Sequence, residues 1–274
     1  MSKNTRSQNG LRAQARGFIA SAAAFYGVLM AAIVSLILIS AEVSAASEPK
    51  RILLIGATAK AAPQLINQAL EAGHEVIGLA RRPEAVEIKH ERFTVVKGDV
   101  YDLGSLEDAL TGDEVVISYL DIPFTTGIEI TEEVYLLSRG TKNIIQAMYN
   151  KGNRRFIAVS TRGVETVIVD KPSADAPITD HISWDRRRKY DDHRRMDELV
   201  KASSLDWIIL RPTNLMEAPM RGTVNTVVNR HMYIAVNGKM PPRGRTLTNA
   251  DFAAFILDQL DSDEYLGKIV GLYN

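Results

Sequence analysis

The stretch RILLIGATAKAAPQLINQALEAGHEVIGLA, residues 51–80, decides the fold. It begins with an apolar run at 51–57, continues with helical periodicity at 61–72, and returns to an apolar run at 75–80. Gly73 stands where the helix has to end, because glycine readily adopts the left-handed conformation of a carboxyl-terminal cap. The order strand, helix, strand predicts the right-handed crossover unit of a parallel sheet.

The same alternation continues to the end of the chain. Most of the expected strands are apolar almost without interruption, as strands covered by helices on both faces must be. The expected strands are 51–57, 75–80, 93–99, 114–120, 155–161, 206–212 and 268–273, and the expected helices are 61–72, 103–110, 129–151, 184–203 and 249–260. We therefore predict an α/β fold, a doubly wound parallel sheet of Rossmann-like type, in a single domain at 50–274. Its ligands should bind beyond the carboxyl ends of the strands.

Three further stretches of the chain bear on the ligand site. The longest segment without an assignment is 162–182, and loops of that length are often functional. The segment 119–124 and the end of the strand at Arg211, Pro212 and Thr213 are expected to form walls of the ligand cleft.

Composition excludes several classes of site. The 274 residues carry 33 basic and 33 acidic side chains, so no overall field draws the chain to nucleic acid or to an anionic membrane. The arginine-rich run at 185–195 is interleaved with aspartates, which favours a solvated helix. The absence of cysteine excludes disulfides, zinc–thiolate sites and iron–sulfur clusters. The five histidines are scattered without the spacing of metal ligands, so no metal is expected.

Residues 1–49 are expected to form a signal peptide or a membrane anchor. Residues 1–41 contain no acidic side chain, and basic residues precede an uncharged stretch at 18–40 that is long enough to span a bilayer. The small residues at 43–45 favour a cleaved signal peptide, whereas the length of the stretch favours an uncleaved anchor. Both alternatives predict export of residues 50–274 to a periplasmic or other extracytoplasmic location. An organellar transit sequence stays open as a third interpretation.

Several stretches along the chain together resemble one known family. They are LLIGAT with ALEAGHEVIGLARRPE, then VVKGDVYDLGSLEDAL, FIAVST, DELVKASSLDWIILRPTNL, LTNADFAAFILDQL and YLGKIV. The chain resembles the atypical short-chain dehydrogenase/reductases, an NAD(P)-binding group that includes NmrA-like regulators and biliverdin-reductase-B-like flavin reductases. The resemblance covers about residues 51–273.

The resemblance implies a cofactor site in the loop that follows the first strand. The family has glycine at the positions of Gly56, Ala59 and Ala62, and only the first remains here. Alanine is tolerated at the third position, where close helix packing is required. Ala59 places a methyl group where the backbone approaches a pyrophosphate, and a positive φ there would add about 1 kcal/mol of strain. Thr58 and Lys60 complete the loop, with Lys60 either a charge for the pyrophosphate or a solvated lysine.

The ends of the next two strands bear on cofactor choice. Arg81 and Arg82 stand where an NAD-specific site has an acidic residue for the ribose 2′-hydroxyl. Guanidinium groups suit a 2′-phosphate, which favours NADP over NAD. Asp99 and Val100 match the family positions that flank the adenine, although Asp99 also suits an ordinary turn.

Catalysis in the family uses a serine after the fifth strand and a tyrosine followed four residues later by lysine. The hydroxyls polarise a carbonyl and supply a proton, while the lysine lowers the pKa of the tyrosine. Ser160 and Thr161 stand at the expected strand end, and Tyr190 is followed four residues later by Arg194. Arginine differs from lysine in shape and hydrogen-bond geometry, so the usual catalysis is in question. Tyr190 equally suits a surface tyrosine on a charged helix.

Two functions follow from these residues. The first is an NADP(H)-dependent oxidoreductase that acts on a small carbonyl, quinone or flavin substrate. The second is a catalytically inactive module that keeps the fold in order to sense a cofactor or bind a protein, because fold alone does not establish function. In the first case the partner is a small molecule, with membrane contact only through an uncleaved 18–40 segment.

Overall fold

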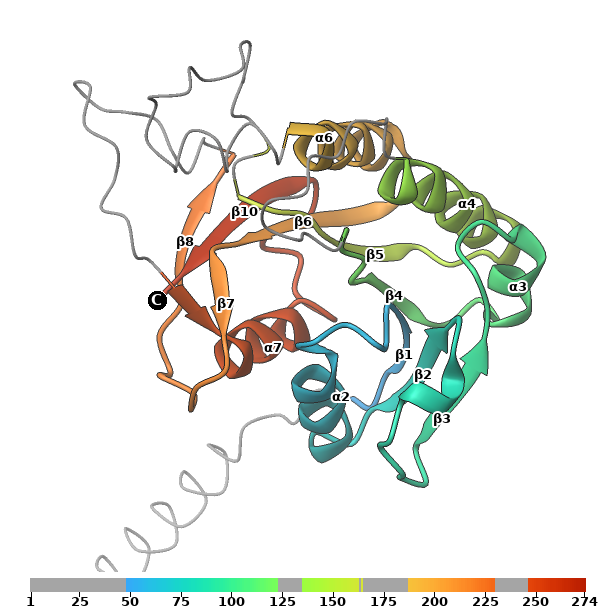
Figure 1. Cartoon of the computed structure of the whole chain (residues 1–274), viewed down its shortest axis with the longest axis horizontal. Helices are drawn as coiled ribbons and strands as arrows, with labels where there is room; N and C mark the ends of the chain where they lie inside the picture. The colour runs from blue at the N-terminus through green and yellow to red at the C-terminus, as the bar shows by residue number, and fades with distance from the viewer. Residues whose placement is uncertain (1–47, 123–134, 163, 165–186, 230–245) are drawn as a thin grey trace, which may run out of the picture. The chain divides into compact units, whose positions relative to one another are not determined.

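The computed structural model describes residues 48–122, 135–162, 164, 187–229 and 246–274. A mainly parallel sheet forms the centre of this part of the chain (Figure 1). Its strand order is β3-β2-β1-β4-β5-β6-β10-β8. The strands are β1 (Arg51–Ile55), β2 (Glu75–Ala80), β3 (Phe93–Lys97), β4 (Val115–Ser118), β5 (Arg155–Val159), β6 (Asp206–Pro212), β8 (Asn225–Val228) and β10 (Lys268–Tyr273). Only the pairing of β10 with β8 is antiparallel. The order reverses between β1 and β4, so the predicted doubly wound fold is confirmed.

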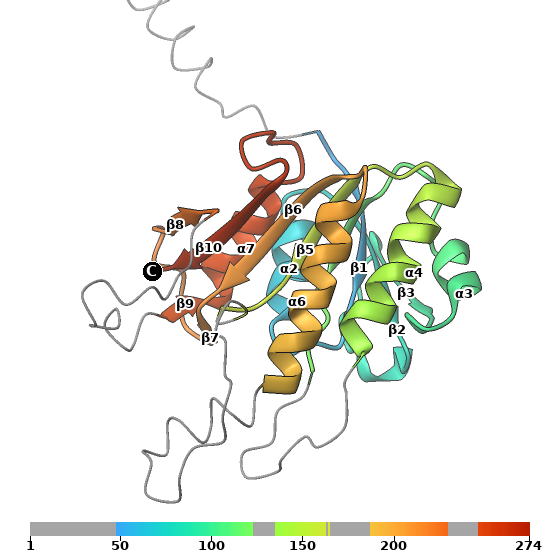
Figure 2. The same ribbon diagram turned by 90° about the horizontal axis from the view of Figure 1, so that it is seen from above.

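Helices cover both faces of this sheet (Figure 2). One face carries α2 (Ala62–Glu71) and α7 (Asn249–Asp258), and the other carries α3 (Leu103–Asp108), α4 (Leu136–Lys151) and α6 (Arg187–Ala202). Successive side chains of a strand point to opposite faces. In β1, Ile52 and Leu54 therefore pack with α2 and α7, while Leu53 and Ile55 pack with α4 and α6. This double burial explains why the strands read as uninterrupted apolar runs.

The structure also contains elements that the sequence did not indicate. They are a 3-10 turn, η1 (Pro83–Ala85), the edge strand β8, and the short strands β7 (Asn214–Met216) and β9 (Thr246–Thr248), which pair in a separate parallel sheet. These strands have no apolar run, because they are short or partly exposed. All seven expected strands are present, some with ends shorter by one or two residues.

Several expectations fall outside the described residues. They include the predicted signal peptide or anchor, the starts of the helices expected at 129–151 and 184–203, and most of the segment 162–182. Within the described ranges, no helix is both long enough and apolar enough to cross a membrane. The chain from Pro49 to Asn274 forms one compact unit.

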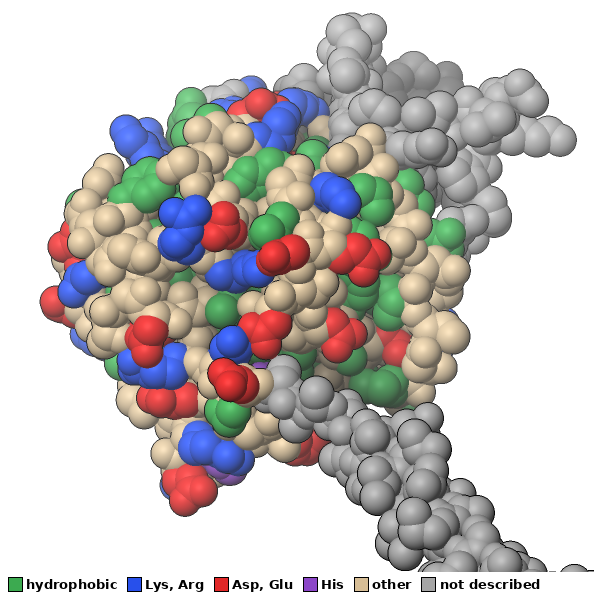
Figure 3. Space-filling model, turned by 180° about the vertical axis from the view of Figure 1, so that it is seen from behind, with side chains coloured by type: hydrophobic (Ala, Val, Ile, Leu, Met, Phe, Trp, Pro, Cys, Tyr) green, Lys and Arg blue, Asp and Glu red, His purple; other side chains and the backbone are tan. Residues whose placement is uncertain are grey.

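Charges on the described surface are mixed. On the face shown in Figure 3, basic and acidic side chains are interspersed. Exposed ion pairs join several of them, including Arg154 with Asp206 and Lys201 with Glu198. Within the same residues, no group of three or more metal-ligating side chains could hold a metal ion.

Candidate functional site

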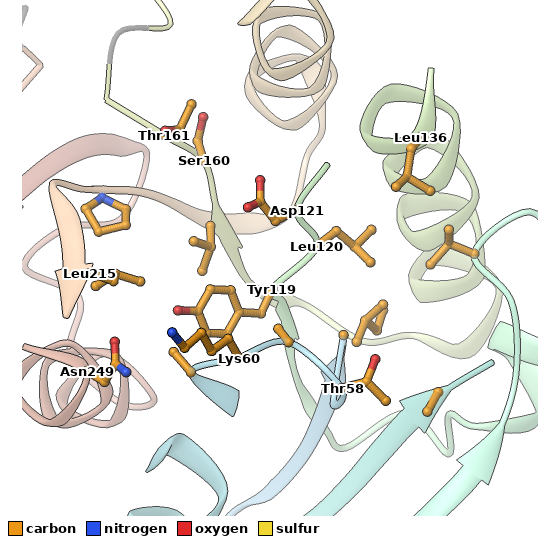
Figure 4. A pocket seen from close by; sticks show the side chains of 18 of the residues that line it. Thr58, Lys60, Tyr119, Leu120, Asp121, Leu136, Ser160, Thr161, Leu215 and Asn249 are labelled. Carbon is orange, nitrogen blue, oxygen red and sulfur yellow. The ribbon is translucent and has the colours of Figure 1, made fainter. Parts of the chain in front are cut away.

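A pocket of about 750 Å³ opens at the carboxyl ends of the parallel strands. Its lining includes residues from the loops after β1, β2, β3, β4, β5 and β6, together with α6, β7 and the start of α7 (Figure 4). This is the edge at which doubly wound sheets bind ligands, and the volume is typical of a small-molecule site.

The turn after β1 requires glycine at its first position. Gly56 has a φ of +95°, and a Cβ atom there would stand 2.5 Å from the carbonyl oxygen of Tyr119. The N–H of Ala59 donates to the carbonyl of Gly56 at 2.9 Å and closes the turn. Ala59 itself has no positive φ, since Asn229 is the only non-glycine residue with one in the described ranges. The backbone strain considered for Ala59 is therefore absent, although its methyl group still lines the pocket.

The first turn of α2 carries no side-chain cap and no negative charge. Its cap residue Ala61 provides no side-chain hydrogen bond, and the turn holds no acidic residue. The first N–H groups of a helix lack partners within the helix and carry partial positive charge. In α2 the N–H of Ala62 donates to the carbonyl of Ala59 at 2.9 Å and Pro63 has no N–H, so an anion would depend on the later N–H groups of this turn. Thr58 and Lys60 line the pocket beside this turn (Figure 4). The arrangement suits a phosphate group.

Charged groups after β2 and β3 line the same pocket. Arg81 and Arg82 are exposed and have no ion-pair partner in the part of the chain that the structure describes. Asp99 is half-buried, and its Oδ1 atom accepts the N–H of Tyr101 at 3.0 Å. Asp99 is thus both a turn aspartate and a pocket residue, with the buried Val100 beside it.

Hydroxyl groups stand at the end of β5. Ser160 is 4% exposed, and its Oγ atom has no hydrogen-bond partner among the described residues. The hydroxyl of Thr161 lies 3.3 Å from the carbonyl of Arg162. Both residues line the pocket, and Figure 4 shows them next to each other near Asp121. The Ser160 hydroxyl also acts on the buried Asp197: burial raises the pKa of that carboxyl to about 7, and Ser160 opposes this shift.

The structure does not bring Tyr190 and Arg194 to this pocket. Arg194 instead pairs with Asp191 at 2.6 Å and donates to the carbonyl of Val164 at 2.8 Å. The residues of α6 that line the pocket are Lys189 and His193, each one position earlier.

The core residues of α6 explain this rotation. Met196 and Val200 are buried, and residues three, four and seven positions apart share a helix face. Continuing the stripe from Val200 and Met196 towards the amino end leads to His193 and then to Lys189. In the sequence both pairs have the same four-residue spacing, and the match to a tyrosine followed by a cation favoured Tyr190 and Arg194 over Lys189 and His193.

Lys189 and His193 surround the carboxylate of Asp121, which follows β4. Nζ of Lys189 lies 2.5 Å from Oδ1 of Asp121, whereas Nε2 of His193 lies 3.9 Å from the same oxygen, too far for a hydrogen bond. Burial lowers the pKa of His193, although Asp121 opposes this shift, so the imidazole is neutral near pH 7. Burial raises the pKa of Asp121, but the long polar contact from the His193 ring and the charge of Lys189 outweigh burial and hold the pKa below its usual value.

A buried ion pair fixes α6 on the sheet. Nη2 of Arg211 lies 2.6 Å from Oδ2 of Asp197, and both residues are buried. Arg211 was expected at the mouth of the cleft, but the structure places it in this pair. Pro212 and Thr213 do line the pocket, as do Tyr119 and Asp121 from the segment predicted to form another wall.

Known proteins resemble this chain in sequence and fold. A family model described as NAD(P)H-binding matches residues 56–263. Cinnamoyl-CoA reductase 1 of Petunia hybrida is 26% identical over 65% of this chain and 58% of its own length. Divinyl chlorophyllide a 8-vinyl-reductase of Oryza sativa subsp. indica is 23% identical over 83% of this chain and 55% of its own. The chain thus spans little more than half the length of these two relatives.

A solved structure shares the fold. It is that of a short-chain dehydrogenase/reductase from Veillonella parvula in complex with NADP, with a TM-score of 0.60 and 21% identity. The superposition covers 82% of this chain and 94% of the other.

Proposed function

Because the chain belongs to the NAD(P)H-binding family, whose model matches residues 56–263, we propose that it is an NADP(H)-dependent oxidoreductase acting on a small carbonyl, quinone or flavin substrate. One observation carries the proposal. A single pocket joins a glycine turn and two arginines suited to phosphates with a cluster of proton-bearing side chains.

The residues present fit a dinucleotide. The start of α2 has no side-chain cap, and neither arginine is engaged in an ion pair within the described ranges. Gly56 is required by the chain itself, because a Cβ atom there would clash with the carbonyl oxygen of Tyr119. The pyrophosphate would lie against the Gly56 turn and Lys60, and Arg81 and Arg82 would hold the 2′-phosphate. Asp99 and Val100 would border the adenine.

The other end of the pocket suits a substrate that accepts electrons. A bound nicotinamide supplies the hydride. The chain supplies hydrogen-bond donors from Ser160, Lys189 and His193, while Leu120 and Leu136 contribute apolar surface that limits water. Polar groups placed among apolar walls orient a small molecule.

One observation favours a second function, cofactor sensing without turnover. In the described part of α6, the pocket contains no tyrosine at the position expected to supply a proton. Tyr119 does line the pocket, but burial raises its pKa, and its ring packs edge-on against Phe252. Tyr119 is therefore a poor proton donor.

Calorimetric titration of the full chain with NADPH and with NADH tests the proposal. We expect micromolar binding of NADPH, weaker binding of NADH, and oxidation of NADPH in the presence of quinones, flavins or aldehydes. Failure of both dinucleotides to bind at millimolar concentration would contradict any cofactor-dependent function. Binding without turnover of any of these substrates would support the sensing module instead.

A further inference from the structure

Lys189 has a donor to spare at the pocket. Its Nζ atom has two acceptors among the described residues, Oδ1 of Asp121 at 2.5 Å and the carbonyl of Ile122 at 3.1 Å. An ammonium group carries three N–H donors, so one is left for a ligand. The Lys189 side chain is only 13% exposed and is therefore held in this position.

His193 has no hydrogen-bond partner for either ring nitrogen in the described part of the chain. Its side chain is 2% exposed and belongs to the pocket lining. Buried polar groups nearly always have a partner, and one left without any calls for a ligand or a bound water. A neutral imidazole offers one donor and one acceptor for that purpose.

The two side chains converge on one place. They stand one helical turn apart on α6, and nitrogens of both lie nearest the same oxygen of Asp121. The ammonium of Lys189 neutralises that carboxylate. The other nearby acid, Asp192, accepts the N–H groups of Leu137 and Ser138 at the start of α4. Neither Asp121 nor Asp192 therefore presents an uncompensated charge that would repel a negatively charged ligand at this point.

We propose that Lys189 and His193 together bind the substrate oxygen that gains negative charge, and that Lys189 supplies the proton which the resembled family takes from a tyrosine. The chemical step rests on the proposed function, whereas the binding of an oxyanion does not. As the carbonyl carbon accepts the hydride, the electron pair of the C=O π bond moves to oxygen. That oxygen takes a proton from Nζ of Lys189, which regains one from water. His193 donates a hydrogen bond through its neutral ring.

A nitrophenol tests oxyanion binding without any cofactor, because its ionised form is coloured. The full chain is titrated with 4-nitrophenol at a pH about one unit below the pKa of the free phenol. Donors aimed at the oxygen favour the ionised form, so we expect the pKa of the bound phenol to fall by about one unit or more. Lys189→Met and His193→Leu should each lose most of this shift.

Lys201→Met is the matched control. Lys201 lies on the same helix, pairs with Glu198 at 2.6 Å, and does not line the pocket, so the shift should be unchanged. Retention of NADPH affinity within about threefold would show that the Lys189 and His193 variants are folded. With an aldehyde substrate, Lys189→Met should lower kcat about a hundredfold or more while KM changes little.

Two results would overturn the inference. The first is an unshifted nitrophenol with the unmodified protein at millimolar concentration. The second is a shift that survives in Lys189→Met while NADPH affinity falls tenfold or more, which would assign Lys189 to the cofactor site. A shift that depends on Lys189, combined with no reductase activity, would support oxyanion binding and refute the proposed function.

Discussion

Replacing Arg81 and Arg82 with alanine should remove the preference for NADPH. Both side chains line the pocket at the end of β2, and neither forms an ion pair within the described ranges. A 2′-phosphate therefore has no existing pair to displace. Because both side chains are exposed, solvent weakens each guanidinium–phosphate contact towards about 1 kcal/mol.

Two such contacts amount to about 2 kcal/mol, or roughly a thirtyfold loss of NADPH affinity in the double variant. Each single variant should lose about fivefold if the contacts are independent. NADH has no 2′-phosphate, so its affinity should not change. Added salt should weaken NADPH binding more than NADH binding, because exposed charges are screened.

Calorimetry with both dinucleotides measures these ratios directly. Arg154→Ala is the control, since Arg154 precedes β5 at the opposite end of the sheet and pairs with Asp206. An unchanged ratio of NADPH to NADH affinity in the double variant would refute the assignment. An equal loss for both dinucleotides would place the arginines on a part of the cofactor that the two share.

Two further predictions concern stability, and denaturant unfolding measures both. Gly56→Ala should lower the free energy of unfolding by about 3 kcal/mol or more, because the new Cβ would clash with the Tyr119 carbonyl and the positive φ would be strained. Gly152→Ala is the control. Its φ is similar but the space around it is open, so it should cost only about 1 kcal/mol. For Glu114, burial raises the pKa, but hydrogen bonds led by that from Thr111 lower it to about 2. Since the folded pKa lies below the unfolded one, the stabilisation is complete above about pH 5 and is lost as the pH falls towards 2. Glu114→Gln should therefore cost about 2–3 kcal/mol of stability at pH 7 and progressively less in acid. A cost independent of pH would contradict this account.

The elements of the sheet could be predicted because their signal is local. Each strand covered on both faces is a short apolar run, and each covering helix repeats its apolar residues with helical spacing. The edge strand β8 and the short strands β7 and β9 gave no such signal, since each gains its hydrogen bonds from a partner distant in the chain.

The signal for the proposed phosphate end of the site was equally local. Gly56, Lys60, Arg81 and Arg82 occupy the ends of consecutive strands, and parallel strands bring those ends to one edge. The sequence could not give the backbone angle of Ala59. The structure shows a turn closed by its N–H group without a positive φ.

The sequence by itself thus determined the fold class and which strand ends meet at the pocket, because both follow from periodicity and strand order. Only the tertiary structure decided which face of α6 lines the pocket. Tyr190 with Arg194 and Lys189 with His193 have the same spacing, and the packing of Met196 and Val200 against the core selects the second pair. The ion pair of Lys189 with Asp121 likewise exists only after folding, because it joins a helix to a strand end 68 positions earlier in the sequence.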